Sequence, residues 1–237
     1  MYWHIKHLLK IVGNFAVYYL LTGIIVVLIF VIVTFLTGNE ISGISIEFLT
    51  DVVSLFVVFL FFSLYKKNIQ SELFKTKLQI KKVLTLIGYS VLLRIALLII
   101  LVSGIFLLSF WFGDKLEDLI NTGIEYQWSV FDGAKGLDTV LGFASFVIYG
   151  PIQEELFFRG VIFAYLKKHY RGLFAVIYAS AIFALAHIHP GLYFSSFIVG
   201  LVLSYIFLKW NNLWYCVIFH ILFNLQPFIL MAIFGSQ

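Results

Sequence analysis

The chain has 237 residues, of which 62% are hydrophobic and only 12% charged, and its mean hydropathy is +1.03. A soluble domain of this size has too small an interior to bury so many apolar side chains, so the composition excludes a soluble globular protein and indicates a membrane protein. The net charge of +4 is modest, and the basic residues stand at the ends of apolar segments, which is typical of membrane topology and not of nucleic-acid binding.

Long apolar runs, without the alternation over about ten residues that marks barrel strands, predict spanning helices. The dipeptide Gly150-Pro151 interrupts one of these runs and predicts a kink or a break there. The sequence therefore predicts an all-α, polytopic transmembrane helix bundle of about seven helices, or eight if that run is divided. In chain order, the predicted helices are Ile11–Thr37, Ile46–Tyr65, Val83–Phe112, Thr139–Leu166, Gly172–His187, Leu192–Leu208 and Leu213–Phe234.

Charges at the helix ends predict the orientation of the bundle. Three of the connections are basic, and the others are acidic or neutral. The positive-inside rule then places the amino terminus in the cytoplasm and the carboxyl terminus outside, in a multi-pass protein of the cell membrane. The basic connections contain Lys66, Lys67, Lys75, Lys77, Lys81 and Lys82, then Lys167, Lys168 and Arg171, and finally Lys209.

Polar side chains that are costly in lipid stand inside these apolar helices. Measured from the nearest basic helix end, five of them lie 11 to 16 residues into their helices. That distance is about 16–24 Å, close to the middle of a hydrocarbon core about 30 Å thick. Ionisable groups at this depth usually face a bundle interior and serve function, so we expect one polar site near mid-membrane. The five residues are Arg94, Glu154, His187, His220 and Asn224.

Spacing along the helices suggests a role for each polar side chain. Glu155 and Arg159 are four residues apart, which predicts an ion pair with a supporting role. Glu154 lies about 100° further around the helix, away from that pair, and is a candidate general base. His220 and Asn224 share one helix face and can donate hydrogen bonds to a developing oxyanion, or orient a water or a metal.

Two imidazoles and a carboxylate also form a ligand set for a divalent ion such as zinc. The candidate ligands are Glu154, His187 and His220. Their spacing is not that of a His-Glu-x-x-His motif, so a metal-free mechanism stays open as the alternative. The interpretation without catalysis is that the polar groups hydrogen bond one another between helices. We assign a structural role of this kind to two further residues. Arg94 is expected to pair with an intramembrane glutamate, and Gln153 is expected to form local hydrogen bonds.

Three motifs, in this order, resemble those of the CPBP family. This family comprises type II CAAX prenyl endopeptidases and bacteriocin-processing or immunity proteins, and is also called the Abi family. Glu-Glu-x-x-x-Arg occurs at Glu154–Arg159, Phe-x-x-x-His at Phe183–His187 and His-x-x-x-Asn at His220–Asn224. The resemblance covers about 90 residues of the carboxyl-terminal half. It divides a single membrane domain into helices of uncertain role, residues 1–113, and core helices that carry the motifs, residues 137–237.

The resemblance implies an intramembrane endopeptidase that hydrolyses a peptide bond in a membrane-associated peptide or protein. The residues matching Glu154 and His187 are implied to activate water. Those matching His220 and Asn224 are implied to stabilise the oxyanion. The family is regarded as metal-dependent, although a metal-free glutamate mechanism has also been argued.

The pair matching Glu155 and Arg159 is implied to support the architecture. The implied partners are membrane lipid and a peptide or protein substrate, with no nucleic acid. Two other functions fit the same residues. One is a non-catalytic bacteriocin-immunity or partner-binding protein on the same scaffold. The other is a transporter or proton relay, which the lack of an inverted repeat disfavours.

Overall fold

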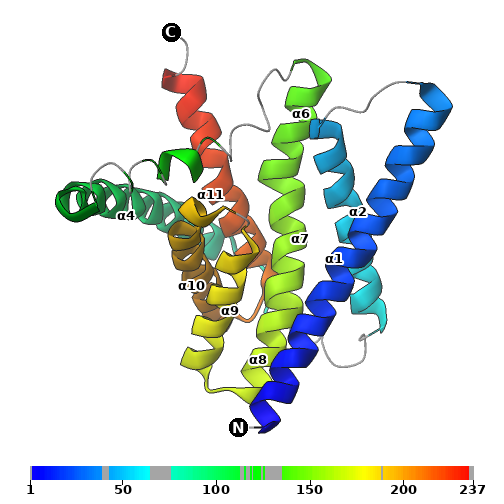
Figure 1. The fold of residues 1–237 in the computed structure, drawn as a ribbon. Coiled ribbons are helices and arrows are strands. Elements are labelled where there is room, and N and C mark those ends of the chain that lie inside the picture. Colours follow the sequence, from blue (N-terminus) through cyan, green and yellow to red (C-terminus); the bar gives the residue numbers. More distant parts are fainter. Residues whose placement is uncertain are drawn as a thin grey trace.

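The computed structural model describes residues 2–38, 43–64, 76–112, 115, 118, 120–123, 125, 135–187 and 189–234. These residues form helices, and none of the described ones is in a strand. Helices α1 (Tyr2–Thr37), α2 (Gly43–Leu64) and α4 (Ile80–Phe112) precede a long central helix (Figure 1). Helices α9 (Gly172–Ala186), α10 (Tyr193–Trp210) and α11 (Leu213–Phe234) follow it.

Each of the predicted spanning helices coincides with a helix of the structure, and the prediction of an all-α membrane helix bundle is confirmed. Within the described residues, three helices are long and apolar enough to cross a membrane, namely Ile80–Gly104, Pro190–Trp210 and Leu213–Leu230. Shorter apolar helices cover Leu20–Leu36, Phe48–Val58 and Gly172–Ala186.

The central helix runs without a break from α6 (Leu137–Ala144) through α7 (Gly150–Phe157) to α8 (Ala164–His169). Two wide π turns, η1 (Ser145–Tyr149) and η2 (Phe158–Phe163), join its parts. The amide of Gly150 donates to the carbonyl of Ser145, five residues earlier. The predicted interruption at Gly150-Pro151 is thus a π turn. The helix continues through it although Pro151 has no amide hydrogen to donate.

Neighbouring helices cover both sides of the central helix. Helix α2 contacts α6 and α7 on one side, and α11 contacts α7 on the other. Helix α4 packs chiefly on α11, and α10 packs on both α9 and α11. A tight link joins the last two helices: Asn211 takes a left-handed conformation at φ 47°, and the side chain of Asn212 accepts a hydrogen bond from the amide of Trp214 at the start of α11.

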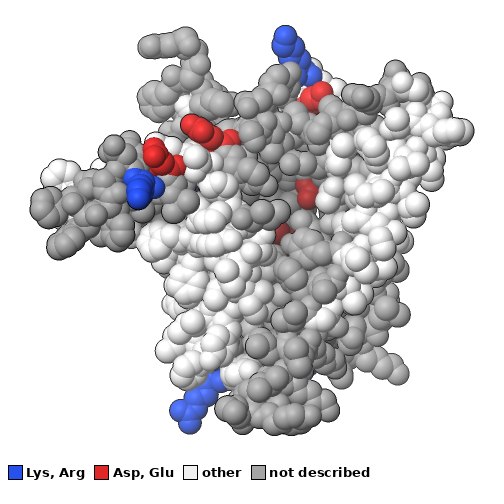
Figure 2. Space-filling model, in the orientation of Figure 1, with Lys and Arg blue, Asp and Glu red and all other residues white. Residues whose placement is uncertain are grey.

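The outer surface of α1 and α4 is strongly apolar. Phe35 is 86% exposed and Phe106 is 79% exposed. On the face drawn in Figure 2, the basic residues shown lie at the top, at the bottom and at the left edge of the molecule, and uncharged residues cover wide areas between them. Such a surface suits lipid contact. Helix α1 begins at one end of the bundle and α11 ends at the other (Figure 1). Which end faces the cytoplasm stays a prediction, and Lys66, Lys67 and Lys75 lie outside the described residues.

Helices α9 and α10 approach closely at Gly200. A Cβ atom at this position would lie 3.1 Å from both the Cα and the Cβ of Ser180 and 3.3 Å from the ring of Phe183. Two of these atoms are backbone or fixed to it, so they cannot move aside cheaply. Small residues permit this kind of approach between apolar helices.

Gly200→Ala is therefore expected to lower the melting temperature by about 5 °C, since overpacking costs about 1–3 kcal/mol. The measurement is thermal unfolding in detergent, followed by tryptophan fluorescence. Gly88→Ala is the matched control, because a Cβ at Gly88 meets nothing within 4 Å and alanine favours a helix. Equal melting temperatures for the two variants would contradict the close approach.

Candidate active site

The site is centred on a carboxylate that is fully removed from solvent. Glu155 of α7 is 0% exposed, and Arg159, one turn later, is 1% exposed. Arg159 Nη1 donates to Glu155 Oε1 over 2.9 Å. The ion pair predicted from the four-residue spacing is present, and it reduces the cost that two isolated charges would have in an apolar interior.

Arg159 is also held by the two helices beyond it. Its Nη2 donates to the carbonyl of Gly200 on α10 over 3.2 Å. Its guanidinium carbon lies 4.5 Å from the ring centroid of Phe183 on α9. The arginine therefore joins the central helix to the closely packed pair α9 and α10, and the glycine that permits their approach also supplies a hydrogen-bond acceptor.

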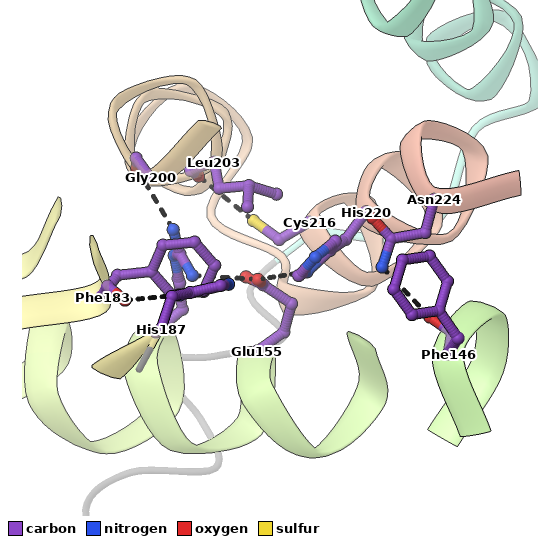
Figure 3. Close-up of polar contacts among 10 residues, drawn as sticks. Phe146, Glu155, Phe183, His187, Gly200, Leu203, Cys216, His220 and Asn224 are labelled. Atoms are coloured by element: carbon purple, nitrogen blue, oxygen red, sulfur yellow. Dashed lines mark hydrogen bonds and ion pairs between the residues drawn. The ribbon is translucent and has the colours of Figure 1, made fainter. Parts of the chain in front are cut away.

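His220 of α11 completes the contacts of Glu155. Its Nδ1 lies 3.0 Å from Glu155 Oε1, so one carboxylate oxygen accepts from both Arg159 and His220 (Figure 3). Because a carboxylate oxygen accepts, Nδ1 carries the hydrogen, and Nε2 is the nitrogen left for other partners. This contact between residues 65 apart is absent from the sequence prediction, which grouped His220 with Asn224 and, as a candidate metal ligand, with Glu154 and His187.

His187 follows the last residue of α9, at the predicted helix end. Its Nδ1 lies 2.8 Å from the carbonyl of Phe183, one turn earlier, which it satisfies at the end of the helix. The carbonyl accepts, so Nδ1 again carries the hydrogen and Nε2 is left for another partner. The ring of Phe183 contacts both imidazoles, at centroid distances of 4.7 Å to His187 and 6.0 Å to His220. Phe183 thus packs against both histidines.

Asn224, one turn after His220, reaches back to the central helix. Its Nδ2 donates to the carbonyl of Phe146 over 3.1 Å (Figure 3). In the register of η1, the amide that would donate to this carbonyl belongs to Pro151, which has no N–H. The asparagine takes the place of that amide. One of its two amide hydrogens is used in this way, and the other is left for a further acceptor.

Glu154 stands apart from these contacts. Among the described residues no hydrogen bond or ion pair joins it to the other candidates, and its Oε2 is a buried atom without a hydrogen-bond partner. Glu155 Oε2 and Arg159 Nε are in the same condition. The structure therefore brings together Glu155, Arg159 and His220 directly. It connects His187 through Phe183, and it keeps Glu154 next in sequence but outside the ion pair, as its position on the helix predicts.

Two other predicted partners are wrong. Arg94 pairs with no glutamate among the described residues; it donates to the carbonyl of Phe223 and the side chain of Gln226 on α11. Gln153 is not a local group, because its Oε1 accepts a hydrogen bond of 2.6 Å from Tyr18 on α1. Pattern alone does not show which neighbouring helix a side chain faces.

Asp51 was not singled out from the sequence. It lies on α2 and accepts a hydrogen bond from Ser145, the first residue of the π turn before Pro151. The signal that would have found it is an acidic residue inside the apolar run Ile46–Tyr65. Through this contact and that of Tyr18, the amino-terminal helices hold the central helix close to Glu154.

The donors do not form a metal site as they stand. The part of the chain that the structure describes includes Glu154, His187 and His220, and it contains no group of three or more His, Cys, Asp or Glu side chains that could hold a metal ion. The closest carboxylate and imidazole, Glu155 and His220, already share their contact with Arg159. The expected ligand set therefore stays a prediction.

A bundle of apolar helices around buried acid, base and amide groups defines a membrane protein with a polar intramembrane site. Residues 136–226 match the family described as Type II CAAX prenyl endopeptidase Rce1-like. This match, over less than half of the chain, supports the CPBP family assignment indicated by the three motifs. No curated protein and no solved structure matches the chain. The matched segment contains all six candidate site residues from Glu154 to Asn224.

Breaking the buried ion pair should destabilise the fold. Arg159→Met leaves the Glu155 carboxylate buried beside His220 alone, and an uncompensated buried charge costs about 3 kcal/mol, which lowers the melting temperature of a chain of this size by about 6–12 °C. Lys168→Met removes an exposed cation from the same helix and is the control. Thermal unfolding of both variants tests this, and an Arg159→Met protein as stable as the control would show that the pair contributes little.

Proposed function

We propose that this protein is an intramembrane endopeptidase that hydrolyses a peptide bond in a membrane-associated peptide or protein. The observation that carries the proposal is the match of residues 136–226 to the CAAX-type protease family, over a segment in which the motif residues Arg159 and His220 contact the buried carboxylate of Glu155. At the level of the family, the protein is a CAAX-type intramembrane protease with a peptide or protein substrate.

Glu154 is the proposed general base. It carries a carboxylate that no arginine or histidine neutralises in the described structure, and its buried Oε2 has no hydrogen-bond partner. Buried polar atoms of this kind usually bind water or ligand. In the proposed step, Glu154 takes a proton from a water molecule as the water oxygen attacks the scissile carbonyl carbon. Glu154 then gives that proton to the leaving amide nitrogen as the C–N bond breaks.

His187 and Asn224 are arranged to assist this step. The contact of His187 with the Phe183 carbonyl leaves Nε2 of the neutral ring as an acceptor, which suits a residue that orients or deprotonates water. Asn224 keeps one amide hydrogen beyond its contact with Phe146, and that hydrogen is the proposed donor to the oxyanion.

His220 contributes to the oxyanion site in this proposal through Nε2, because Nδ1 is directed to Glu155. The imidazolium form donates from both nitrogens and places its positive charge beside the Glu155 carboxylate. The ion pair of Glu155 and Arg159 thereby acts on the reaction indirectly, since it fixes the ring of His220 between the central helix and α11.

Glu154→Gln is expected to abolish cleavage while the protein stays folded, because glutamine retains the shape of the side chain but cannot accept the proton. The measurement is cleavage of a fluorogenic peptide library by purified protein in proteoliposomes, together with its melting temperature. Glu125→Gln makes the same substitution at an exposed glutamate and is the control. A Glu154→Gln protein with full activity would remove Glu154 from the mechanism.

Chelators are expected to leave cleavage unchanged, since the described donors do not form a three-ligand group and the proposed step uses side chains alone. The test is the same assay with and without 1,10-phenanthroline, with metal analysis of the purified protein. Loss of cleavage that added zinc restores, with about one equivalent of bound metal, would instead support Glu154, His187 and His220 as ligands.

A further inference from the structure

A second proline weakens the backbone of α11 beside the proposed oxyanion residues. Pro227 lies inside this helix. It has no amide hydrogen to give to the carbonyl of Phe223, four residues earlier, and its ring crowds that carbonyl. Phe223 directly precedes Asn224 in the chain. Asn224, the proposed donor to the oxyanion, therefore lies in a helical turn that lacks one backbone hydrogen bond.

Arg94 on α4 supplies the missing donor. Its Nη2 donates to the Phe223 carbonyl over 2.7 Å, and its Nε donates to Gln226 Oε1 over 3.3 Å. Its guanidinium carbon also lies 3.8 Å from the ring centroid of Phe223. Gln226 Nε2 in turn donates to Ser90 on α4 over 3.0 Å. The guanidinium group of Arg94 thus links one turn of α11 to α4 through two hydrogen bonds, one to a backbone carbonyl and one to a side chain.

Asn224 links the same turn of α11 to the central helix, because its side chain donates to the Phe146 carbonyl. The stretch from Phe223 to Pro227 therefore lies between α4 on one side and η1 on the other. We propose that Arg94 is a positioning residue, which caps the carbonyl freed by Pro227 and so holds Asn224 in register with the central helix. Arg94 lies outside the segment matched by the family model. The proposal rests on the proposed function for its catalytic consequence only.

A plain anchoring role for Arg94 would predict a different pattern of effects. An arginine that only secures α4 to the bundle would change stability without a specific link to Pro227 or Asn224. A positioning role requires that the effect of removing Arg94 shrink when the missing amide is restored. It also requires that the effect on turnover disappear when Asn224 is absent.

The first measurement is a stability cycle that needs no activity. Arg94→Met removes the donors and is expected to lower the melting temperature by about 5 °C. Pro227→Ala returns an amide hydrogen to the Phe223 carbonyl, so Arg94→Met should cost less than half as much in the Pro227→Ala background. Lys81→Met removes an exposed cation near the start of α4 and serves as the control for loss of charge. Equal losses in both backgrounds would overturn the capping role.

The second measurement is turnover in the peptide-cleavage assay. Arg94→Met is expected to lower kcat about tenfold with KM within about twofold, because the oxyanion is bound only in the transition state. Arg94→Lys keeps one donor and should recover kcat to within about threefold of the original protein. In an Asn224→Ala background, Arg94→Met should change kcat by less than about twofold, since the residue it positions is gone.

Unchanged kcat in a folded Arg94→Met protein, or a tenfold loss that persists in the Asn224→Ala background, would overturn the positioning role. If Arg94→Met does not fold, the Arg94→Lys protein and the double variant with Pro227→Ala give the same comparison. Absence of cleavage by the original protein would overturn the proposed function instead, and the stability cycle would still decide whether Arg94 caps Pro227.

Discussion

The whole arrangement depends on the need to neutralise a carboxylate that has no access to solvent. Glu155 is 0% exposed, and an isolated charge in such a place costs several kcal/mol. Arg159, on the same helix, and His220, on α11, offset that cost at one oxygen. Arg159 is further tied to α9 and α10, and His220 lies on α11. The contacts of Glu155 with Arg159 and His220 therefore set the position of the central helix relative to the others. Apolar burial alone does not, because lipid is as apolar as the helix surfaces and favours no particular packing.

Two prolines give the bundle its second set of specific contacts. Pro151 and Pro227 each leave a backbone carbonyl without its usual helical donor, and in each case a polar side chain from another helix bonds the carbonyl concerned. Asn224 bonds the Phe146 carbonyl and Arg94 bonds the Phe223 carbonyl. A neutral peptide group buried in lipid must find a donor, so such gaps select particular partners where apolar packing does not. Both gaps lie next to the proposed oxyanion site.

Features within a single helix could be predicted from the sequence, whereas most contacts between helices could not. The bounds of the helices follow from apolar runs, and the pair of Glu155 with Arg159 follows from helical geometry. The contact of His220 with Glu155 depends on how two distant helices are rotated toward each other. An amphipathic helix of a soluble protein reveals its inward face, but helices that are apolar on every side do not. The same ambiguity explains the wrong partners predicted for Arg94 and Gln153.

The hydrogen bonds from Tyr18 to Gln153 and from Ser145 to Asp51 have a consequence for how the protein is divided. Both join α1 or α2, which lie outside the matched segment, to the two turns that precede Glu154. A fragment cut at residues 136 and 226 would turn the amide of Gln153 and the hydroxyl of Ser145 toward hydrocarbon. The region recognisable by homology therefore depends on α1 and α2 for these two polar contacts.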